Sequence, residues 1–244
     1  MGVPHFFAGA PEPGQTVVLS AEDAHHAMRS LRLRPGDRFT SSDGQGGLAT
    51  CRVVRASGLL LEGEVEERID EARPRPILRV LLSPPKGDRL AWAIQKLVEV
   101  GADEIVLVEA GRSVRRWKGD RAGRAKERLG VVGREAAKQA RRRFLADVSG
   151  PAPWDQALED AVDSGPAVVL WERADRGLLD ALPSERPEIL ALAVGPEGGI
   201  SEEDAVAAGD RGALLASLGP NILRTETAAV AAASVALARY GRLG

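Results

Sequence analysis

Short apolar runs alternate with helical segments over the last two thirds of the chain. The apolar runs are found at residues 77–82, 105–108, 167–170, 189–194 and 214–218. The helical segments are expected at residues 89–100, 120–141, 201–209 and 225–240. Each apolar run is short enough to be a buried strand rather than a helix. Strands alternating with helices are typical of a parallel sheet covered on both faces. The pattern therefore predicts an α/β fold for residues 77–244.

The first 72 residues have a different pattern, in which short strands follow one another with turns between them. Pro35-Gly36-Asp37 and Asp43-Gly44-Gln45-Gly46-Gly47 are the clearest turns. Closely spaced short strands favour a small β-barrel. Pro74 and Pro76 then interrupt the chain, because proline continues neither a helix nor a central strand. We therefore expect a β-barrel domain at 1–72, a linker at 73–76 and the α/β domain at 77–244.

The composition excludes several classes of protein. Hydrophobic residues make up 44% and charged residues 28% of the 244 residues, as in globular rather than disordered proteins. The longest apolar run, 189–194, is far shorter than the roughly 20 residues of a bilayer span. No secretory signal is visible, and Cys51 is the only cysteine. A reducing, cytoplasmic setting without membrane association is therefore expected. A metal site is not expected, because His25 and His26 are neighbours and have no cysteine partners.

The charge distribution points to a polyanionic partner although the formal net charge is only −2. Between residues 111 and 143, arginines and lysines far outnumber the acids, which are Asp120, Glu127 and Glu135. Residues 155–210 are acidic instead. Charge that is segregated in this way predicts contact with a nucleic acid, although the formal net charge gives no sign of it. The alternative is a solvated basic face that only keeps the protein in solution.

Two loops at the ends of predicted strands are candidates for a binding site. Val194-Gly195-Pro196-Glu197-Gly198-Gly199-Ile200-Ser201 is the first, and residues 217–227, Ser-Leu-Gly-Pro-Asn-Ile-Leu-Arg-Thr-Glu-Thr, are the second. Ligands of open α/β sheets bind outside the carboxyl ends of the strands, and glycine lets the backbone approach them closely. The alternative for the first loop is an ordinary tight turn. Neither loop has the glycine and lysine pattern of a phosphate-binding motif, which disfavours phosphate transfer.

Arg224 stands just before a predicted helix, where the helix dipole disfavours a cation. Its position therefore suggests a function. The alternative is an ion pair with Glu226 or Glu197.

These loops resemble the ribosomal RNA small subunit methyltransferase E family of the SPOUT superfamily. Further similar segments are Pro4–Phe7, Asp23–His26, Leu31–Asp37, Pro85–Arg89, Gln95-Lys96, Glu99–Gly101, Arg112–Val114, Arg134–Ala137 and Gln139. The resemblance thus spans nearly the whole chain in order. Where the family has a Glu-Gln-Ser/Cys-Gly-Arg-like run, this chain has Lys138-Gln139-Ala140-Arg141-Arg142.

The resemblance implies an enzyme that transfers a methyl group from S-adenosylmethionine (SAM) to N3 of a uridine in 16S rRNA of the small ribosomal subunit. It also implies a PUA-like β-barrel, a trefoil knot in the α/β domain and a homodimer. Arg224 and Glu226 are the expected catalytic residues. The expected SAM-binding residues are Leu170, Val194, Gly195, Glu197, Gly198, Gly199, Ser217, Leu218, Gly219, Ile222, Leu223 and Thr227. The expected RNA-binding residues are Arg32, Lys86, Arg112, Arg115, Arg116, Arg141 and Arg142.

Two other functions stay open. The chain could be an RNA-binding ribosome-assembly factor that has lost the chemistry, or a SPOUT enzyme that methylates the ribose 2′-oxygen. The intact glycine-rich loops favour an enzyme, and the N-terminal barrel favours methylation of a base.

Overall fold

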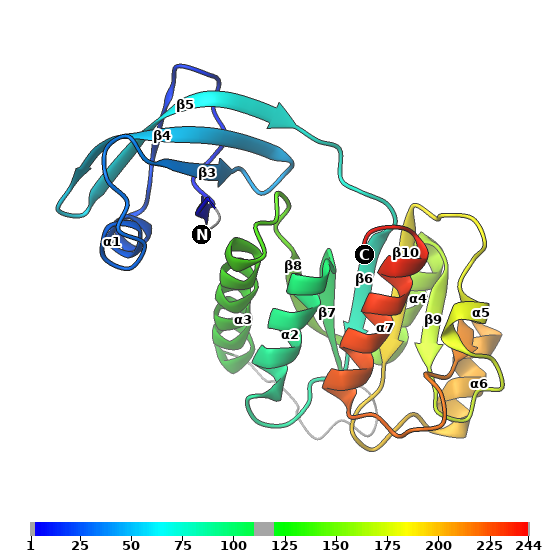
Figure 1. Cartoon of the computed structure of the whole chain (residues 1–244). Helices are drawn as coiled ribbons and strands as arrows, with labels where there is room; N and C mark the ends of the chain where they lie inside the picture. The colour runs from blue at the N-terminus through cyan, green and yellow to red at the C-terminus, as the bar shows by residue number, and fades with distance from the viewer. Residues whose placement is uncertain (1–2, 110–119, 244) are drawn as a thin grey trace. The chain divides into compact units, whose positions relative to one another are not determined.

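The chain divides into two compact units. The computed structural model describes residues 3–109 and 120–243, except for the side chains of residues 120–122. The first unit runs to Arg73 and also contains Ala137–Leu145, and the second unit contains Pro74–Ala136 and the chain from Ala146 onward (Figure 1). The first unit thus ends where the prolines predict a linker.

A five-stranded sheet and one helix make up the first unit. Its elements are β1 (His5–Phe6), β2 (Thr16–Val18), α1 (Ala21–Arg29), β3 (Arg38–Ser42), β4 (Gly47–Ser57) and β5 (Leu60–Asp70). The hydrogen-bonded order is β1-β3-β4-β5-β2, antiparallel except for β1 and β3. Phe6, Phe39 and Leu61 are fully buried in its core. Ser20 caps α1, because its Oγ accepts a hydrogen bond from the Asp23 N–H at 3.1 Å.

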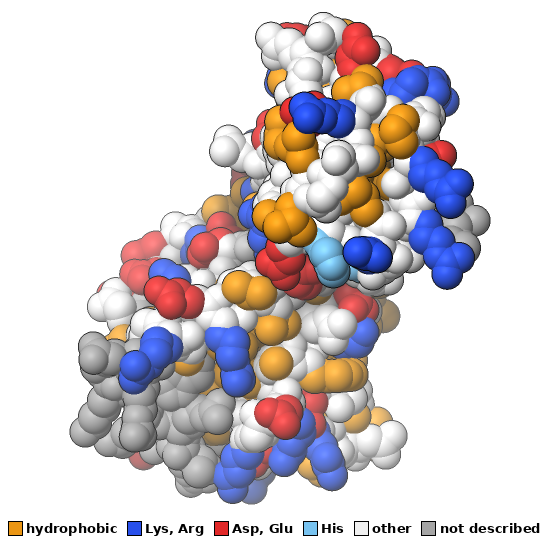
Figure 2. All heavy atoms as spheres, turned by 90° about the vertical axis from the view of Figure 1, so that its left-hand side faces the viewer, with side chains coloured by type: hydrophobic (Ala, Val, Ile, Leu, Met, Phe, Trp, Pro, Cys, Tyr) orange, Lys and Arg blue, Asp and Glu red, His pale blue; other side chains and the backbone are white. Residues whose placement is uncertain are grey.

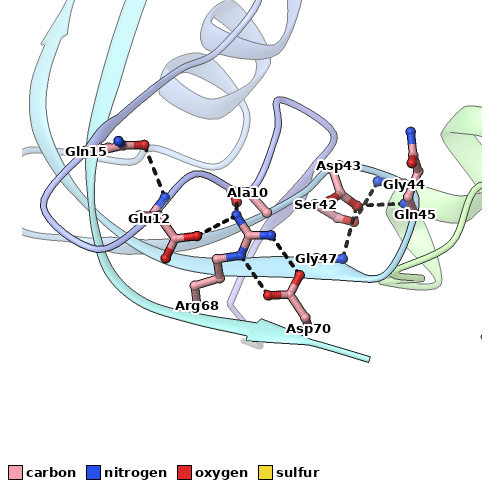
Figure 3. A network of polar contacts seen from close by, with 10 residues as sticks. All are labelled: Ala10, Glu12, Gln15, Ser42, Asp43, Gly44, Gln45, Gly47, Arg68 and Asp70. Carbon is pink, nitrogen blue, oxygen red and sulfur yellow. Dashed lines mark hydrogen bonds and ion pairs between the residues drawn. The ribbon is translucent and has the colours of Figure 1, made fainter. Parts of the chain in front are cut away.

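Polar contacts fix the turn between β3 and β4 and the end of β5 (Figure 3). The Asp43 carboxylate accepts hydrogen bonds from the backbone N–H groups of Gln45, at 2.7 Å, and Gly47, at 3.1 Å. The Arg68 guanidinium contacts Asp70 at 2.8 Å and Glu12 at 3.2 Å. These contacts support the turn that the sequence predicts at residues 43–47, because a short acidic side chain can satisfy the backbone donors of a tight turn.

The segment 137–145, which begins with the last residues of the helix α3 (Asp120–Gln139), is built into the first unit. The Ser42 hydroxyl donates to the Arg143 carbonyl at 2.8 Å, and the Leu145 N–H donates to the Gly44 carbonyl at 3.0 Å. The Lys138 ammonium lies 2.7 Å from the Asp23 carboxylate. The predicted boundary at residue 77 would instead assign this segment to the α/β domain. Strand and helix periodicity do not reveal which unit a short loop packs against.

A six-stranded parallel sheet forms the second unit (Figure 1). Its strands are β6 (Ile77–Leu82), β7 (Glu104–Glu109), β8 (Asp147–Pro153), β9 (Ala167–Leu170), β10 (Ile189–Val194) and β11 (Leu214–Ala216). The strand order is β11-β9-β10-β6-β7-β8, and every pair in it is parallel. Val194 of β10 is in register with Leu82 of β6 and with Leu170 of β9, and Leu170 is in register with Ala216 of β11. The carboxyl ends of four strands therefore lie at one edge.

Helices cover both faces of this sheet, as the alternating pattern predicts. They are α2 (Arg89–Val100), α3 (Asp120–Gln139), α4 (Trp154–Ser164), α5 (Leu178–Ala181), α6 (Glu202–Asp210) and α7 (Thr225–Arg239). Ala191 and Ala193 of β10 pack with buried residues of α4 and α6. Leu190 and Leu192 alternate with them and therefore point to the opposite face, where α7 contacts α2, β6 and β10. Among the described residues, no helix is long and apolar enough to cross a bilayer.

Several element boundaries differ from the predictions. The basic helix ends at Gln139 rather than 141, because Arg141 has a left-handed backbone with φ of 53°. The strand at 214 ends at Ala216, where Ser217 begins a turn by accepting the Gly219 N–H at 3.1 Å. The edge strand β8 and the helix α4 were not predicted. Two prolines and a glycine mask β8 in the sequence, and an edge strand tolerates them. The trefoil knot stays a prediction.

Candidate functional site

A cavity of about 520 Å³ lies at the carboxyl ends of β9, β10 and β11. Leu170, Val194 and Ala216, the last residues of these strands, form part of its wall. The loops after the strands supply most of the rest. The cavity lies where ligands of parallel α/β sheets bind, and its volume is in the range of small-molecule sites, roughly 300–1,000 Å³.

The first glycine-rich loop combines a packing requirement with a turn requirement. A Cβ atom on Gly195 would lie 2.5 Å from Cγ1 of Ile200, so a larger residue does not fit there. Gly199 has φ of 74°, a conformation that other residues rarely adopt. Ser201 then caps α6 by accepting a hydrogen bond from the Asp204 N–H at 3.0 Å. Ordinary packing thus explains Gly195 without a ligand.

The second loop is open toward the cavity at its glycine. Gly219 has φ of 103°, and a Cβ atom there would meet no atom within 4 Å. The two loops are tied together at their bases, where the Thr225 hydroxyl donates to the Gly195 carbonyl at 3.2 Å. This hydrogen bond joins the start of α7 to the end of β10.

Two carboxylates near the cavity pair with Arg89 and not with Arg224. Arg89, the first residue of α2, contacts the carboxylates of Glu197, at 3.0 Å, and Glu226, at 3.6 Å. Glu197 also lies 3.8 Å from the Lys86 ammonium. Arg224 is exposed and lines the cavity, and no ion pair involves it within the described ranges. The alternative that Arg224 only pairs with Glu197 or Glu226 therefore does not hold.

Most of the predicted SAM-binding residues line this one cavity. They are Leu170, Val194, Gly195, Glu197, Gly198, Gly199, Ser217, Leu218, Gly219, Ile222 and Leu223. Thr227 is not among the lining residues and is exposed on the first turn of α7. Glu226 does not line the cavity either, because it is buried behind the wall beside Arg89. Helix periodicity explains both exceptions, since residues 226 and 227 follow the loop into α7 and turn away from it.

Sequence reasoning missed several lining residues, notably Arg89, Trp171 and Glu172. Arg89 could have been found by the argument applied to Arg224, since it is a cation at the N-terminus of a helix. Trp171 and Glu172 directly follow β9, and the rule that sites form at strand ends points to them as well. The Glu172 carboxylate would lie 3.5 Å from a Cβ atom on Gly199, so it faces the first loop.

The predicted RNA-binding residues are spread over both units. Arg32 and Arg141 belong to the first unit, are exposed, and are the two non-glycine residues with positive φ in the described chain, at 59° and 53°. Arg142 is partly buried, and Lys86 lies in the second unit with a 57% exposed side chain. Figure 2 shows Lys and Arg side chains on the surface of each unit. Arg112, Arg115 and Arg116 lie outside the described residues.

No group of three or more His, Cys, Asp or Glu side chains could hold a metal ion in the described part of the chain. Cys51 is buried, and this burial raises the pKa of its thiol to about 12. A thiol with so high a pKa is a poor nucleophile at neutral pH.

The fold and the cavity together define an RNA methyltransferase. Residues 73–237 match the RNA methyltransferase domain family, and residues 19–66 match the RNA methyltransferase PUA domain family. The chain belongs to the ribosomal RNA small subunit methyltransferase E family. A member from Mycobacterium bovis is 35% identical over 226 residues, which cover 91% of this chain and 86% of the relative. A member from Bacillus subtilis is 31% identical over 230 residues, 91% of this chain and 90% of the relative.

Solved structures agree with this assignment. The ribosomal RNA small subunit methyltransferase E of Neisseria gonorrhoeae, bound to SAM, superposes with a TM-score of 0.87 at 26% identity. A Legionella pneumophila methyltransferase in complex with SAM gives a TM-score of 0.86 at 26% identity. In each case, 98% of both chains is covered.

Proposed function

We propose that this protein transfers a methyl group from SAM to N3 of a uridine in the RNA of the small ribosomal subunit. One observation carries the proposal: the two glycine-rich loops, distant from each other in sequence, form one cavity at the edge of a parallel sheet. Its family relatives are named as methyltransferases of this RNA, and solved neighbours were crystallised with SAM.

The residues of the cavity fit SAM. Leu218, Ile222 and Leu223 offer apolar surface for the faces of an adenine ring, and loop backbone groups can hydrogen-bond its edge. The open, positive-φ Gly219 leaves room for a ligand close to the main chain. The Glu172 carboxylate can accept hydrogen bonds from two ribose hydroxyls. SAM bound there would supply a methyl group on a positively charged sulfur.

Arg224 is the proposed catalytic residue. N3 of uridine loses a proton as it accepts the methyl group, and negative charge develops on O2 and O4 of the base. A guanidinium that lines the cavity and is not held by a carboxylate can bind this charge more strongly in the transition state than in the ground state. The proposal does not assign the proton acceptor to Glu226, which is buried behind the cavity wall.

RNA binding is proposed to use the basic residues of both units. Arg32 and Arg141 present exposed guanidiniums from left-handed backbone positions, which non-glycine residues adopt at a cost. Lys86 lies beside the cavity residue Glu197 and can contact phosphate near the target base. Arg112, Arg115, Arg116 and Arg142 complete the proposed set. Phosphate contacts position the RNA, and the target uridine must leave its stack to enter the cavity.

The deciding experiment identifies the product. Small-subunit RNA from a bacterial strain that lacks this modification is incubated with the protein and SAM, as free RNA and as assembled subunits. The RNA is then digested, and the methylated nucleoside is identified by mass spectrometry and mapped. We expect N3-methyluridine. Ribose-methylated nucleoside would support the 2′-oxygen alternative, and failure of the wild-type protein to bind SAM would support the assembly-factor alternative.

A further inference from the structure

Arg89 lies between two carboxylates that come from the two loops of the cavity. Its Nη1 atom is 3.0 Å from Oε1 of Glu197 and 3.6 Å from Oε1 of Glu226. Glu197 belongs to the loop after β10, and Glu226 follows the loop after β11. One guanidinium therefore bridges two segments that are about thirty residues apart in the chain.

The position of Arg89 carries an energetic cost that these contacts offset. Arg89 is the first residue of α2, where the helix dipole disfavours a positive charge. The Asp88 side chain makes no capping hydrogen bond that would relieve the exposed N–H groups of α2. The two carboxylates beside the guanidinium offset its positive charge. The arrangement requires Glu197 and Glu226 to stay close to α2.

Glu226 depends on Arg89 in turn. Glu226 is only 6% exposed, and its Oε2 atom has no hydrogen-bond partner among the described residues. A buried carboxylate without a counter-charge is strongly unfavourable, so loss of Arg89 would leave Glu226 uncompensated. Glu226 is in the first turn of α7, directly after the cavity residues Leu223, Arg224 and Thr225. A shift of Glu226 toward water would therefore move the cavity wall.

We propose that Arg89 is a positioning residue for SAM: by binding Glu197 and Glu226 together, it fixes the separation of the two loops that form the cavity. The inference rests on the proposed function, because it assumes that SAM occupies this cavity. Arg89 acts through the two carboxylates, and its effect is felt at the cofactor rather than at the methyl acceptor.

Calorimetric SAM titrations of four variants test this role. Arg89→Met should raise the Kd for SAM by about tenfold or more, because a buried carboxylate loses its partner. Arg89→Lys keeps the charge but lacks the planar fork that contacts two carboxylates, so an intermediate Kd is expected. Arg89→Met/Glu226→Gln should recover a large part of the affinity, since the uncompensated charge is gone. Arg79→Met is the matched control, because Arg79 pairs with Glu104 at 2.6 Å outside the cavity lining.

The outcomes separate a positioning role from a general loss of stability. A folded Arg89→Met protein with a Kd within about twofold of wild type overturns the inference. The inference is also overturned if Arg79→Met, at a similar loss of Tm, raises the Kd for SAM as much as Arg89→Met does. It is overturned as well if Arg89→Met/Glu226→Gln binds SAM no more tightly than Arg89→Met. If Arg89→Met does not fold, the Kd of Arg89→Lys for SAM is the test instead. An unchanged Kd in Arg89→Lys would then overturn the inference. Failure of the wild-type protein to bind SAM would instead contradict the proposed function.

Discussion

At the scale of single residues, Arg224 illustrates how a residue type that does not stabilise its position indicates a function. It is the N-cap of α7 with an extended backbone, and its side chain makes no capping hydrogen bond. The residues usually found at this position are those whose side chains accept a hydrogen bond from the helix. Arginine provides none of this stabilisation, so its presence beside the cavity is better explained by substrate binding.

Replacing Arg224 by alanine should lower turnover by about 100-fold at saturating SAM and RNA, as expected when one transition-state donor is lost. The SAM affinity should stay near the wild-type value. Single-turnover methylation assays and SAM calorimetry measure the two quantities separately. Arg211→Ala is the control, since Arg211 pairs with Asp155 away from the cavity lining. Nearly full turnover in Arg224→Ala would remove Arg224 from the catalytic role.

His5 makes the stability of the protein depend on pH. Burial is the main cause that lowers the pKa of His5 to about 4, below the ordinary 6.5. The unfolded chain therefore takes up a proton on His5 near pH 6.5, whereas the folded protein does so only near pH 4. The contribution of neutral His5 is present above pH 6.5 and is lost as the pH falls through this window.

Urea denaturation at pH 7 and pH 5 tests this effect by comparing wild type with His5→Gln. The wild-type protein should lose more free energy of unfolding between the two pH values than the variant, because glutamine does not titrate. Equal losses in the two proteins would show that His5 is protonated alike in the folded and unfolded states.

At the scale of elements, the end of α3 is held by a buried ion pair. Lys138 and Asp23 have side chains that are 15% and 11% exposed, and 2.7 Å separates their charged atoms. Asp23 is also bonded to Ser20, the cap of α1, at 3.0 Å. This contact gives Lys138 a structural role within the first unit.

Lys138→Met should lower the free energy of unfolding by about 3 kcal/mol, because Asp23 is left as a buried charge without its partner. Lys138→Met/Asp23→Asn should recover part of this loss, since no buried charge remains. Denaturant titration measures both changes. Arg38→Met is the control, because the Arg38 side chain is 57% exposed and water screens its pair with Glu66, so a much smaller loss is expected. A loss as small as that of the control would contradict the assignment.

At the scale of the whole molecule, the excess of arginine and lysine between residues 111 and 143 predicts how RNA affinity depends on salt. Released counterions make the logarithm of affinity fall linearly with the logarithm of salt concentration, with a slope of about 0.7 per phosphate contact for single strands. Arg115→Ala/Arg116→Ala should flatten this slope by about one to two contacts for every RNA sequence. Filter binding at several salt concentrations gives the slopes, and Arg186→Ala/Arg211→Ala removes equal charge elsewhere as a control. An unchanged slope would place both arginines off the RNA-binding surface.

We also propose that the protein is a homodimer with SAM bound near the partner subunit. Ile222 lines the cavity yet is 82% exposed, so a large apolar side chain at the cavity is left uncovered within one chain. Sedimentation should give twice the chain mass of 25.8 kDa. Ile222→Asp should shift the protein toward monomer, whereas Val206→Asp, at a 54% exposed position on α6, should not. A fully active monomer at micromolar concentration would contradict the proposal.

Elements with local signals could be located from the order of residues alone. Apolar runs and helical periodicity located β6, β10, α2 and α6, and Ser20 and Ser201 cap their helices through contacts with residues three positions further on. The two loops of the cavity were also identifiable, because glycines between a strand and a helix have a local signature. Periodicity and capping depend on neighbours within a few residues, so a single sequence contains them.

Which distant residues meet became visible only in the folded chain. In the fold, residues 137–145 belong to the first unit, and Glu226 and Thr227 do not line the cavity. Arg89 contacts the carboxylates of Glu197 and Glu226. These arrangements depend on contacts between segments that are far apart in the chain. Their energies depend on burial and on the distance between charges, which the order of residues alone does not specify.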